Sequence, residues 1–207
     1  MNKPAFFILL AASNLAGQRS IEPKDLDAFN RTVSALSDGT RKGVHLDDKP
    51  GDGVAYLRGI ELGTGTIEFD VRGKDVQGQS FVGVAFHGVD GTTYDAIYFR
   101  PFNFRTADPA RHNHAVQYVS QPTYPWQRLR TERPGVFEQP VSPAPDPNAW
   151  FHVRVVVASP KVSVFVGDAK QPSLVVTQLG DRAKGLVGLW VGNGSGGDFA
   201  DLKITPN

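Results

Sequence analysis

Two histidines stand close together in the stretch Arg111-His112-Asn113-His114. On a strand, residues two apart point to the same side, so His112 and His114 could present both rings to one metal ion. Asp95 or Glu138 would then supply a third ligand. Either imidazole could instead act as a general base near neutral pH. A plain pair of loop histidines is the alternative to both chemical interpretations.

Carboxylates are the second group that could do chemistry. Glycoside hydrolysis needs two carboxyl groups, about 5 Å apart for retention and about 6.5–9.5 Å apart for inversion. Glu68 and Asp70 fall on one face of a strand, which also fits a solvated outer face. Residues that could serve in catalysis are His87, His112, His114 and Glu138.

Saccharide recognition would use an aromatic ring for the apolar face of a sugar and planar polar groups for its hydroxyls. Trp190 is the expected ring, and His87 is expected on the same face. The alternative is that Trp190 and Tyr98 belong to the core and that Arg100 is a surface ion-pair partner. The predicted binding residues are Tyr98, Arg100, Gln117, Trp126, Trp190 and Asn193.

The glycine-rich stretch 192–198 could form a loop that binds a phosphate group or a metal ion. No helix is expected after it, and a phosphate loop needs one, so we exclude a nucleotide site. Oxygen ligands from Asp198 or Asp201 with loop carbonyls would suit calcium. We therefore expect no required cofactor, with calcium as a weak alternative.

Composition narrows the classes of partner. The 207 residues fit one domain with a substantial core. Lys plus Arg number 22 and Asp plus Glu 21, so the net charge of +1 argues against a nucleic-acid partner. The chain has no cysteine, which excludes disulfides, thiolate nucleophiles and iron–sulfur clusters.

The first 18 residues resemble a secretory signal peptide. Lys3 precedes an apolar run at 5–12, which is too short to span a bilayer because a span needs about 20 residues. A buried first strand or helix is the alternative. The sequence thus predicts a secreted or periplasmic protein with no membrane span in its mature chain.

The remaining chain, 19–207, reads as one all-β domain. Residues 66–72 alternate strictly between apolar and charged side chains, as in a half-buried strand. Only 25–36 could form a helix. A long proline-rich segment, about 103–148, is expected to be mostly loop and to form a lid or wall of a cleft, or else to cover a sheet edge. About ten strands are expected from such patterns. The clearer stretches are 66–72, 81–89, 94–102, 115–120, 150–157, 161–166, 173–176, 185–191 and 199–204, and 42–46 and 54–57 could each add a strand.

Three stretches carry a family resemblance. Gly-Thr-Ile-Glu-Phe-Asp-Val-Arg at 65–72 resembles an early strand of laminin-G-like and concanavalin A-like jelly rolls. Ala-Val-Gln-Tyr-Val at 115–119 resembles the central strand of the 3-keto-disaccharide hydrolase family, and 185–193 with 198–204 resembles its closing strands. The family has Glu where this chain has Ala115, so no catalytic carboxylate is carried over to that position. The family usually has Gln after the Gly-Leu of its closing strand, and this chain has Trp190 at that position.

The resemblance implies a two-sheet antiparallel jelly-roll sandwich that handles saccharides on a concave sheet. We expect a carbohydrate-active protein that cleaves glycosidic bonds by hydrolysis or elimination. The alternative is a non-catalytic carbohydrate-binding or adhesion module. Both depend on one pleat assignment, in which Val116, Val187 and Leu189 point inward and Gln117 and Trp190 point outward. The sequence predicts neither the sugar nor the oligomeric state.

Overall fold

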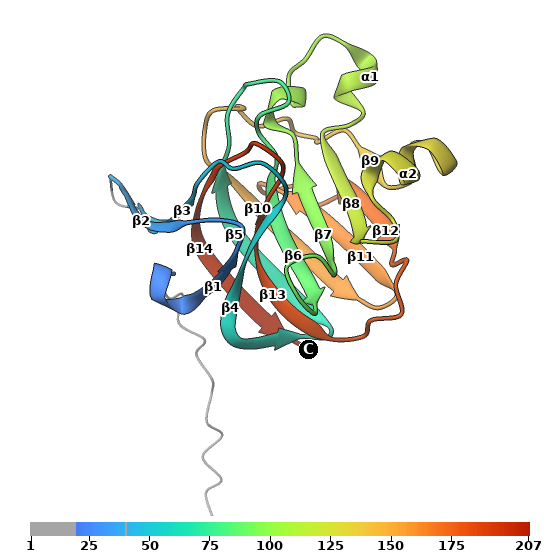
Figure 1. Ribbon diagram of the computed structural model, residues 1–207. Coiled ribbons are helices and arrows are strands. Elements are labelled where there is room, and N and C mark those ends of the chain that lie inside the picture. The colour runs from blue at the N-terminus through green and yellow to red at the C-terminus, as the bar shows by residue number, and fades with distance from the viewer. Residues whose placement is uncertain (1–19, 40) are drawn as a thin grey trace, which may run out of the picture.

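The computed structural model describes residues 20–39 and 41–207. They form two seven-stranded antiparallel sheets packed face to face, a jelly-roll sandwich (Figure 1). Sheet A has the order β1 (Leu26–Phe29), β4 (Gly53–Leu62), β13 (Gly185–Val191), β6 (Val82–Gly88), β7 (Tyr94–Phe99), β8 (Val116–Gln121) and β9 (Glu138–Gln139). Sheet B has the order β12 (Leu174–Thr177), β11 (Lys161–Val166), β10 (Phe151–Ala158), β5 (Gly65–Arg72), β14 (Gly197–Pro206), β3 (Arg41–Leu46) and β2 (Val33–Asp38). The predicted fold class is confirmed, whereas the predicted signal peptide lies outside the described residues.

Alternation along the strands of sheet B builds one half of the core. Ile67, Phe69 and Val71 of β5 are fully buried between the sheets. Their neighbours Glu68 and Arg72 face outward, as the alternating sequence predicted. This burial of every second side chain is what holds one sheet against the other.

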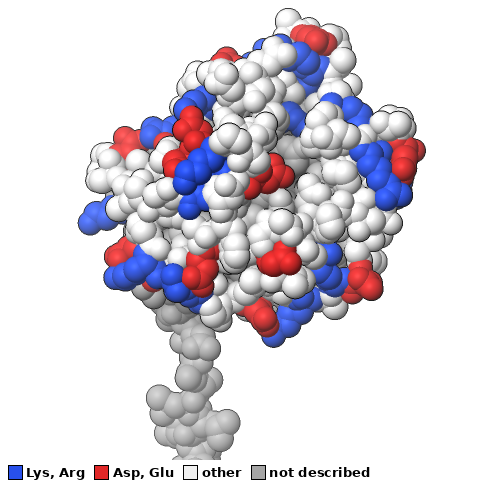
Figure 2. Space-filling model, in the orientation of Figure 1, with Lys and Arg blue, Asp and Glu red and all other residues white. Residues whose placement is uncertain are grey.

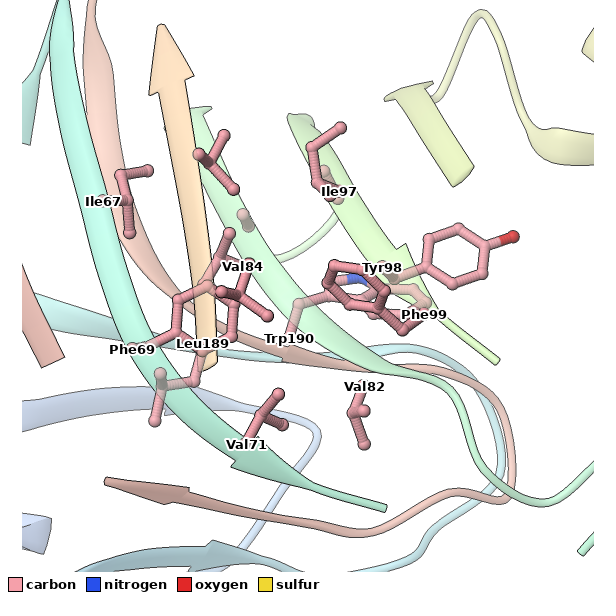
Figure 3. Close-up of a cluster of buried hydrophobic side chains, with 14 of the residues drawn as sticks. Ile67, Phe69, Val71, Val82, Val84, Ile97, Tyr98, Phe99, Leu189 and Trp190 are labelled. Carbon is pink, nitrogen blue, oxygen red and sulfur yellow. The ribbon is translucent and has the colours of Figure 1, made fainter. Parts of the chain in front are cut away.

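The pleat of sheet A agrees with the predicted assignment. Val116, Val187 and Leu189 are buried in the core. Leu189 lies beside core residues of the facing sheet, whereas Trp190, the next residue, lies against Tyr98 (Figure 3). Gln117 pairs with Tyr98 in the β7–β8 ladder and therefore shares that outward face.

Sheet A is also covered on its outer face. Every residue of β6 and β7 is buried, which a sheet with one solvated face would not show. Part of this cover comes from the sheet's own aromatic side chains, since the rings of Trp190 and Tyr98 meet across Gly83, and part comes from α2 (Trp126–Glu132), which packs against β8. The segment 101–139 also holds the helical turn η2 (Pro101–Asn103) and α1 (Pro109–His112), besides β8 and β9. The predicted loop 103–148 is therefore more regular than the proline content suggested.

The stretch 25–36, which could have formed a helix, forms strands instead. Pro23–Asp25 is a short 3-10 turn, η1, and two strands follow it: β1 pairs with β4 in sheet A, and β2 pairs with β3 in sheet B. Asn30, with a left-handed φ of 53°, turns the chain between them. An isolated helix of this length is only marginally stable in water. Strand pairing with β4 and β3 is therefore the more stable arrangement of this segment.

Charge is distributed without a single dominant sign. Lys and Arg are interspersed with Asp and Glu over the face in Figure 2, in keeping with the net charge of +1. Within 20–39 and 41–207, no helix has the length and apolar character needed to cross a membrane.

Candidate functional site

A hollow of about 550 Å³ opens on the outer face of sheet A, and we call it the aromatic hollow. Trp190, Gly83 and Tyr98 follow one another across β13, β6 and β7. Because Gly83 has no side chain, the Trp190 indole can reach the Tyr98 ring, with the ring centroids 4.7 Å apart. The lining residues are Asp52, Gly78, Phe81, Tyr98, Val119, Gln121, Pro125, Trp126, Gln127, Trp190, Gly192 and Asn193.

Trp190 forms the floor of this hollow. Its side chain lies on the outer side of sheet A, as predicted, but only 3% of the residue is exposed. Trp190 and Tyr98 both belong to the buried hydrophobic cluster, as the alternative interpretation held. The indole N–H donates to the Tyr94 hydroxyl at 3.0 Å. A ring fixed in this way shapes the hollow and offers little surface for stacking.

Three predicted binding residues lie beneath the surface. Arg100 donates to the Tyr98 hydroxyl at 2.8 Å and to Gln117 Oε1 at 3.1 Å, and all three side chains are buried. The prediction that they are presented to a ligand is therefore wrong for Gln117, which is fully buried. The pleat was assigned correctly, but the segment 101–139 covers this part of the sheet.

Trp126 and Asn193 remain accessible. Trp126, on α2, is 38% exposed, and the Arg130 guanidinium lies 4.7 Å from its ring centroid. Asn193 Oδ1 accepts a hydrogen bond from the Gly51 backbone at 2.7 Å, which holds the loop before β4 against the rim. Trp126 is thus the exposed aromatic surface of the hollow.

Asp52 is a lining residue that sequence reasoning missed. Burial raises the pKa of its carboxyl, and this outweighs the hydrogen bond from Tyr94 and the charge of Arg31. The Tyr94 hydroxyl lies 3.4 Å from Asp52 Oδ2. The turn sequence Pro-Gly-Asp-Gly at 50–53, directly before a strand, was the available signal.

A second hollow of about 250 Å³ adjoins the first, and we call it the arginine hollow. The two share the lining residues Gly78, Phe81 and Trp126, so they are direct neighbours. Its lining residues are Gln77, Gly78, Phe81, Arg100, Phe102, Asn103, Arg111, His114, Trp126 and Arg130.

Glu138 lies under the arginine hollow and is 3% exposed. Arg130 binds both of its carboxylate oxygens, at 2.8 and 2.6 Å. His114 Nε2 is 3.2 Å from Glu138 Oε1. Burial lowers the pKa of His114, against the opposing charge of Glu138, so this imidazole is neutral near pH 7.

The predicted strand geometry of the histidine pair is wrong. His112 ends α1 and His114 follows that helix, so the two rings are not placed by a pleat. Asp108 starts α1 by accepting hydrogen bonds from the Ala110 and Arg111 backbone, with Pro109 in the first turn. Of the pair, His114 lines the arginine hollow and His112 does not.

His87 was expected on the outer face and is instead enclosed at the edge of the core. Its Nε2 is 2.8 Å from the Gly63 carbonyl, and its Nδ1 is 2.9 Å from Gln178 Nε2. The cause is a register shift in the β6–β13 ladder, where His87 takes a left-handed φ of 49°. Such a bulge redirects the side chain against the alternation.

Asp95 belongs to the same enclosed cluster. Although burial favours the neutral acid, hydrogen bonds from His87 and Ser120 and the charge of Arg182 lower its pKa. Arg182 Nη2 lies 2.7 Å from Asp95 Oδ1. This carboxylate stabilises the loop that follows β12 and does not line either hollow.

The carboxylates considered for calcium have other partners. Asp198 is 2.6 Å from His45 Nδ1 and accepts hydrogen bonds from Arg72 at 2.9 and 2.7 Å. Asp201 lies across a register shift of β14, with a left-handed φ of 53°. Among the residues that the structure describes, no three His, Asp or Glu side chains gather as a metal site would require.

Glu68 and Asp70 occupy the outer face of sheet B, on the opposite side of the sandwich from the hollows. Asp70 contacts Arg41 at 2.9 Å and His152 Nδ1 at 2.8 Å, and Glu68 is 3.5 Å from Lys203 Nζ. Each carboxylate is thus paired with a cation, in keeping with a solvated outer face.

The Asp70–His152 pair predicts a pH-dependent stability. The hydrogen bond to Asp70 raises the pKa of His152 above its ordinary 6.5, against partial burial. The contribution of this pair to the free energy of unfolding is therefore full below the pKa of His152 in the unfolded chain. It is lost as the pH rises through the pKa of His152 in the folded protein. His152→Gln should lower the free energy of unfolding by about 1 kcal/mol or less at about pH 5.5 and by nothing at about pH 9. Urea unfolding at both pH values checks this, and an equal loss at both would contradict it.

A further groove of about 480 Å³ lies near the start of the described chain. Its lining includes Ile21, Leu57, Ile60, Leu202 and Ile204, and no aromatic side chain of the described residues contributes to it. Its surface is therefore aliphatic and lacks the ring that saccharide recognition uses.

Comparison with known proteins gives matches in structure only. No family model matches the chain, and no curated protein matches it. Carbohydrate binding module CBM66 from Bacillus subtilis superimposes with a TM-score of 0.58 at 15% identity, covering 90% of this chain and 96% of that one. A Bacillus subtilis protein with a galectin-like fold gives 0.57 at 12% identity, covering 88% and 90%. The exoplasmic/lumenal domain of VIP36, in a Ca²⁺/Man3GlcNAc-bound form, gives 0.56 at 12%, covering 91% and 88%.

At such identities the likeness establishes the fold alone, which is a galectin-like jelly-roll sandwich. The resemblance to the 3-keto-disaccharide hydrolase family stays a prediction.

Proposed function

We propose that the chain binds a saccharide in the aromatic hollow on the outer face of sheet A. The observation that carries this proposal is the composition of the hollow. Its lining combines an exposed aromatic ring, Trp126, with polar side chains from Asp52, Gln121 and Asn193. Rings pack on the apolar C–H face of a sugar, and such polar groups donate to and accept from its hydroxyls.

The structural neighbours support the same class of ligand. One is named a carbohydrate binding module, and another was solved with Man3GlcNAc. Their sequence identity to this chain is too low to transfer a particular sugar or residue, so the support extends to the class of ligand alone.

Binding without cleavage is the favoured form of this function. Hydrolysis by the usual mechanism needs two carboxyl groups, one on each side of the scissile bond. Of the described residues that line the two hollows, Asp52 alone carries a carboxylate. Glu138 lies beneath the surface, bound by Arg130, where it cannot approach a glycosidic bond.

One observation favours cleavage as a second candidate. A general acid needs a pKa raised toward the working pH, and burial raises the pKa of Asp52 in this way. The third possibility, an adhesion module that binds no glycan, would assign no ligand to the aromatic hollow.

A glycan array probed with the purified chain tests the proposal, followed by product analysis on each glycan retained. Retention of at least one glycan class without release of products is the expected result. Release of shorter products would favour cleavage, and failure to retain any glycan would favour adhesion. Export, predicted from residues 1–18, stays a prediction.

Asp52→Asn separates the roles of this carboxylate. An ionised acceptor at the rim should hydrogen-bond a sugar hydroxyl, so the substitution should weaken binding about tenfold. Because the folded protein raises the pKa of Asp52, the charge disfavours folding near pH 7, and the variant should unfold no more easily than the wild type. Calorimetric titration and urea unfolding check the two results.

Two results with Asp52→Asn would contradict the role given to this carboxylate. Unchanged affinity would remove Asp52 from the binding surface. Product release by the wild type that disappears in Asp52→Asn, with affinity retained, would make Asp52 a general acid and favour cleavage.

A further inference from the structure

The arginine hollow has an excess of positive charge. Arg100, Arg111 and Arg130 line it, and His114 adds a neutral imidazole. The carboxylate in contact with them is Glu138, which Arg130 binds through both oxygens and which lies 3.9 Å from Arg100. Arg130 and Arg100 thus share one buried carboxylate, and Arg111 has no recorded contact with it.

Asp108 is the other carboxylate whose charge acts on His114. It is committed to the start of α1, where it accepts hydrogen bonds from the Ala110 backbone at 2.9 Å and from that of Arg111 at 3.4 Å. Even with Asp108 counted, three cationic groups face two carboxylates. Unbalanced charge held partly out of water is costly, and such arrangements concentrate at functional sites.

Arg111 is held by neutral groups. Its Nε donates to Asn103 Oδ1 at 3.3 Å, and its Nη2 donates to the Phe102 carbonyl at 3.1 Å. The Nη1 groups of Arg111 and Arg130 make no hydrogen bond to any residue that the structure describes. These contacts fix the guanidinium orientation and leave donors for a ligand.

The charged and aromatic hollows are neighbours that share two aromatic rings. Trp126 and Phe81 line both hollows, and the Arg130 guanidinium lies over the Trp126 ring. A sugar ring packed on Trp126 would therefore carry its substituents toward the arginines.

We propose that the arginine hollow binds the acidic group, a carboxylate or a sulfate ester, of an anionic saccharide whose ring packs on Trp126. This inference rests on the proposed function and names its ligand class. A guanidinium group can donate paired hydrogen bonds to two oxygens of one carboxylate or one sulfate group, whereas a neutral hydroxyl has a single oxygen.

The test uses matched acidic and neutral probes with the full chain. Oligogalacturonate is compared with its methyl ester, and sulfated dextran oligosaccharide with unsulfated dextran oligosaccharide, alongside an array that carries neutral, uronate and sulfated glycans. We expect the acidic member of at least one pair, or an acidic glycan of the array over its neutral counterpart, to bind about tenfold more tightly. The carboxylate and sulfate arms identify which acidic group is preferred.

Arg111→Gln is the decisive variant. It should weaken binding of the acidic probe about tenfold and leave binding of neutral glycans unchanged, while Arg111→Lys should retain part of the preference. Arg105→Gln is the matched control, because Arg105 lies in the same segment, pairs with Asp146 at 3.6 Å and lines neither hollow. Circular dichroism verifies that each variant is folded.

The outcomes separate this inference from the proposed function. Binding of neutral glycans with no preference for acidic ones would overturn the inference and leave the proposed function standing. An acidic preference that survives Arg111→Gln would overturn the assignment to this hollow. Failure to bind any glycan would overturn both.

Discussion

Replacing Trp126 by alanine is expected to weaken saccharide binding about thirtyfold or more, because truncating a central tryptophan of a binding surface typically costs about 2 kcal/mol or more. Trp126 lines both hollows and is the ring with an exposed face. Its partial exposure limits the effect on folding, so the free energy of unfolding should change by about 1 kcal/mol or less. Calorimetric titration with a glycan retained on the array measures the first effect.

Trp150→Ala is the control for this result. Trp150 is likewise partly exposed and is packed against the guanidinium groups of Arg41 and Arg72, at 5.1 and 4.9 Å from its ring centroid. It lines neither hollow, so its loss should leave binding unchanged. An equal effect of the two substitutions, or none from Trp126→Ala, would refute the role of Trp126.

The second large effect concerns Glu138. Glu138→Gln should lower the free energy of unfolding by about 3–5 kcal/mol, because removing one partner of a buried ion pair leaves uncompensated charge. Arg130 and Arg100 would both lose their carboxylate. Urea unfolding monitored by circular dichroism measures the change.

Glu132→Gln supplies the comparison for Glu138. Glu132 is exposed and pairs with Arg128 on the same helix, with Nε and Oε1 2.9 Å apart. Such a pair is worth about 0.5 kcal/mol or less, so this variant should unfold almost as the wild type does. Similar small losses in both variants would contradict the structural role of Glu138 and reopen its role as a catalytic residue.

Strand periodicity predicted the sandwich because it records which side chains meet the core. In β5, the alternation of Ile67, Phe69 and Val71 with charged neighbours is visible without any structure. The same reasoning placed Leu189 inward and Trp190 outward. It could not show that the outer face of sheet A is covered, because α2, which packs against β8, forms in a proline-rich segment that was expected to be mostly loop.

The errors at individual site residues have the same origin. His87 departs from the alternation at a register shift, which depends on the neighbouring strand and not on its own sequence. Gln117 was placed on the correct face, but Arg100 holds it beneath the covering segment. Trp126 and Asn193 could be predicted by residue type. For Asp52 the sequence offered only the turn at 50–53, because its burial arises from loops that meet in the fold.

A crystal structure of the chain with a retained oligosaccharide would locate the saccharide. We expect a sugar ring against the face of Trp126, with its hydroxyls near Asp52 and Asn193. A saccharide bound on the outer face of sheet B or in the aliphatic groove beside Ile21, with the aromatic hollow left to solvent, would contradict it.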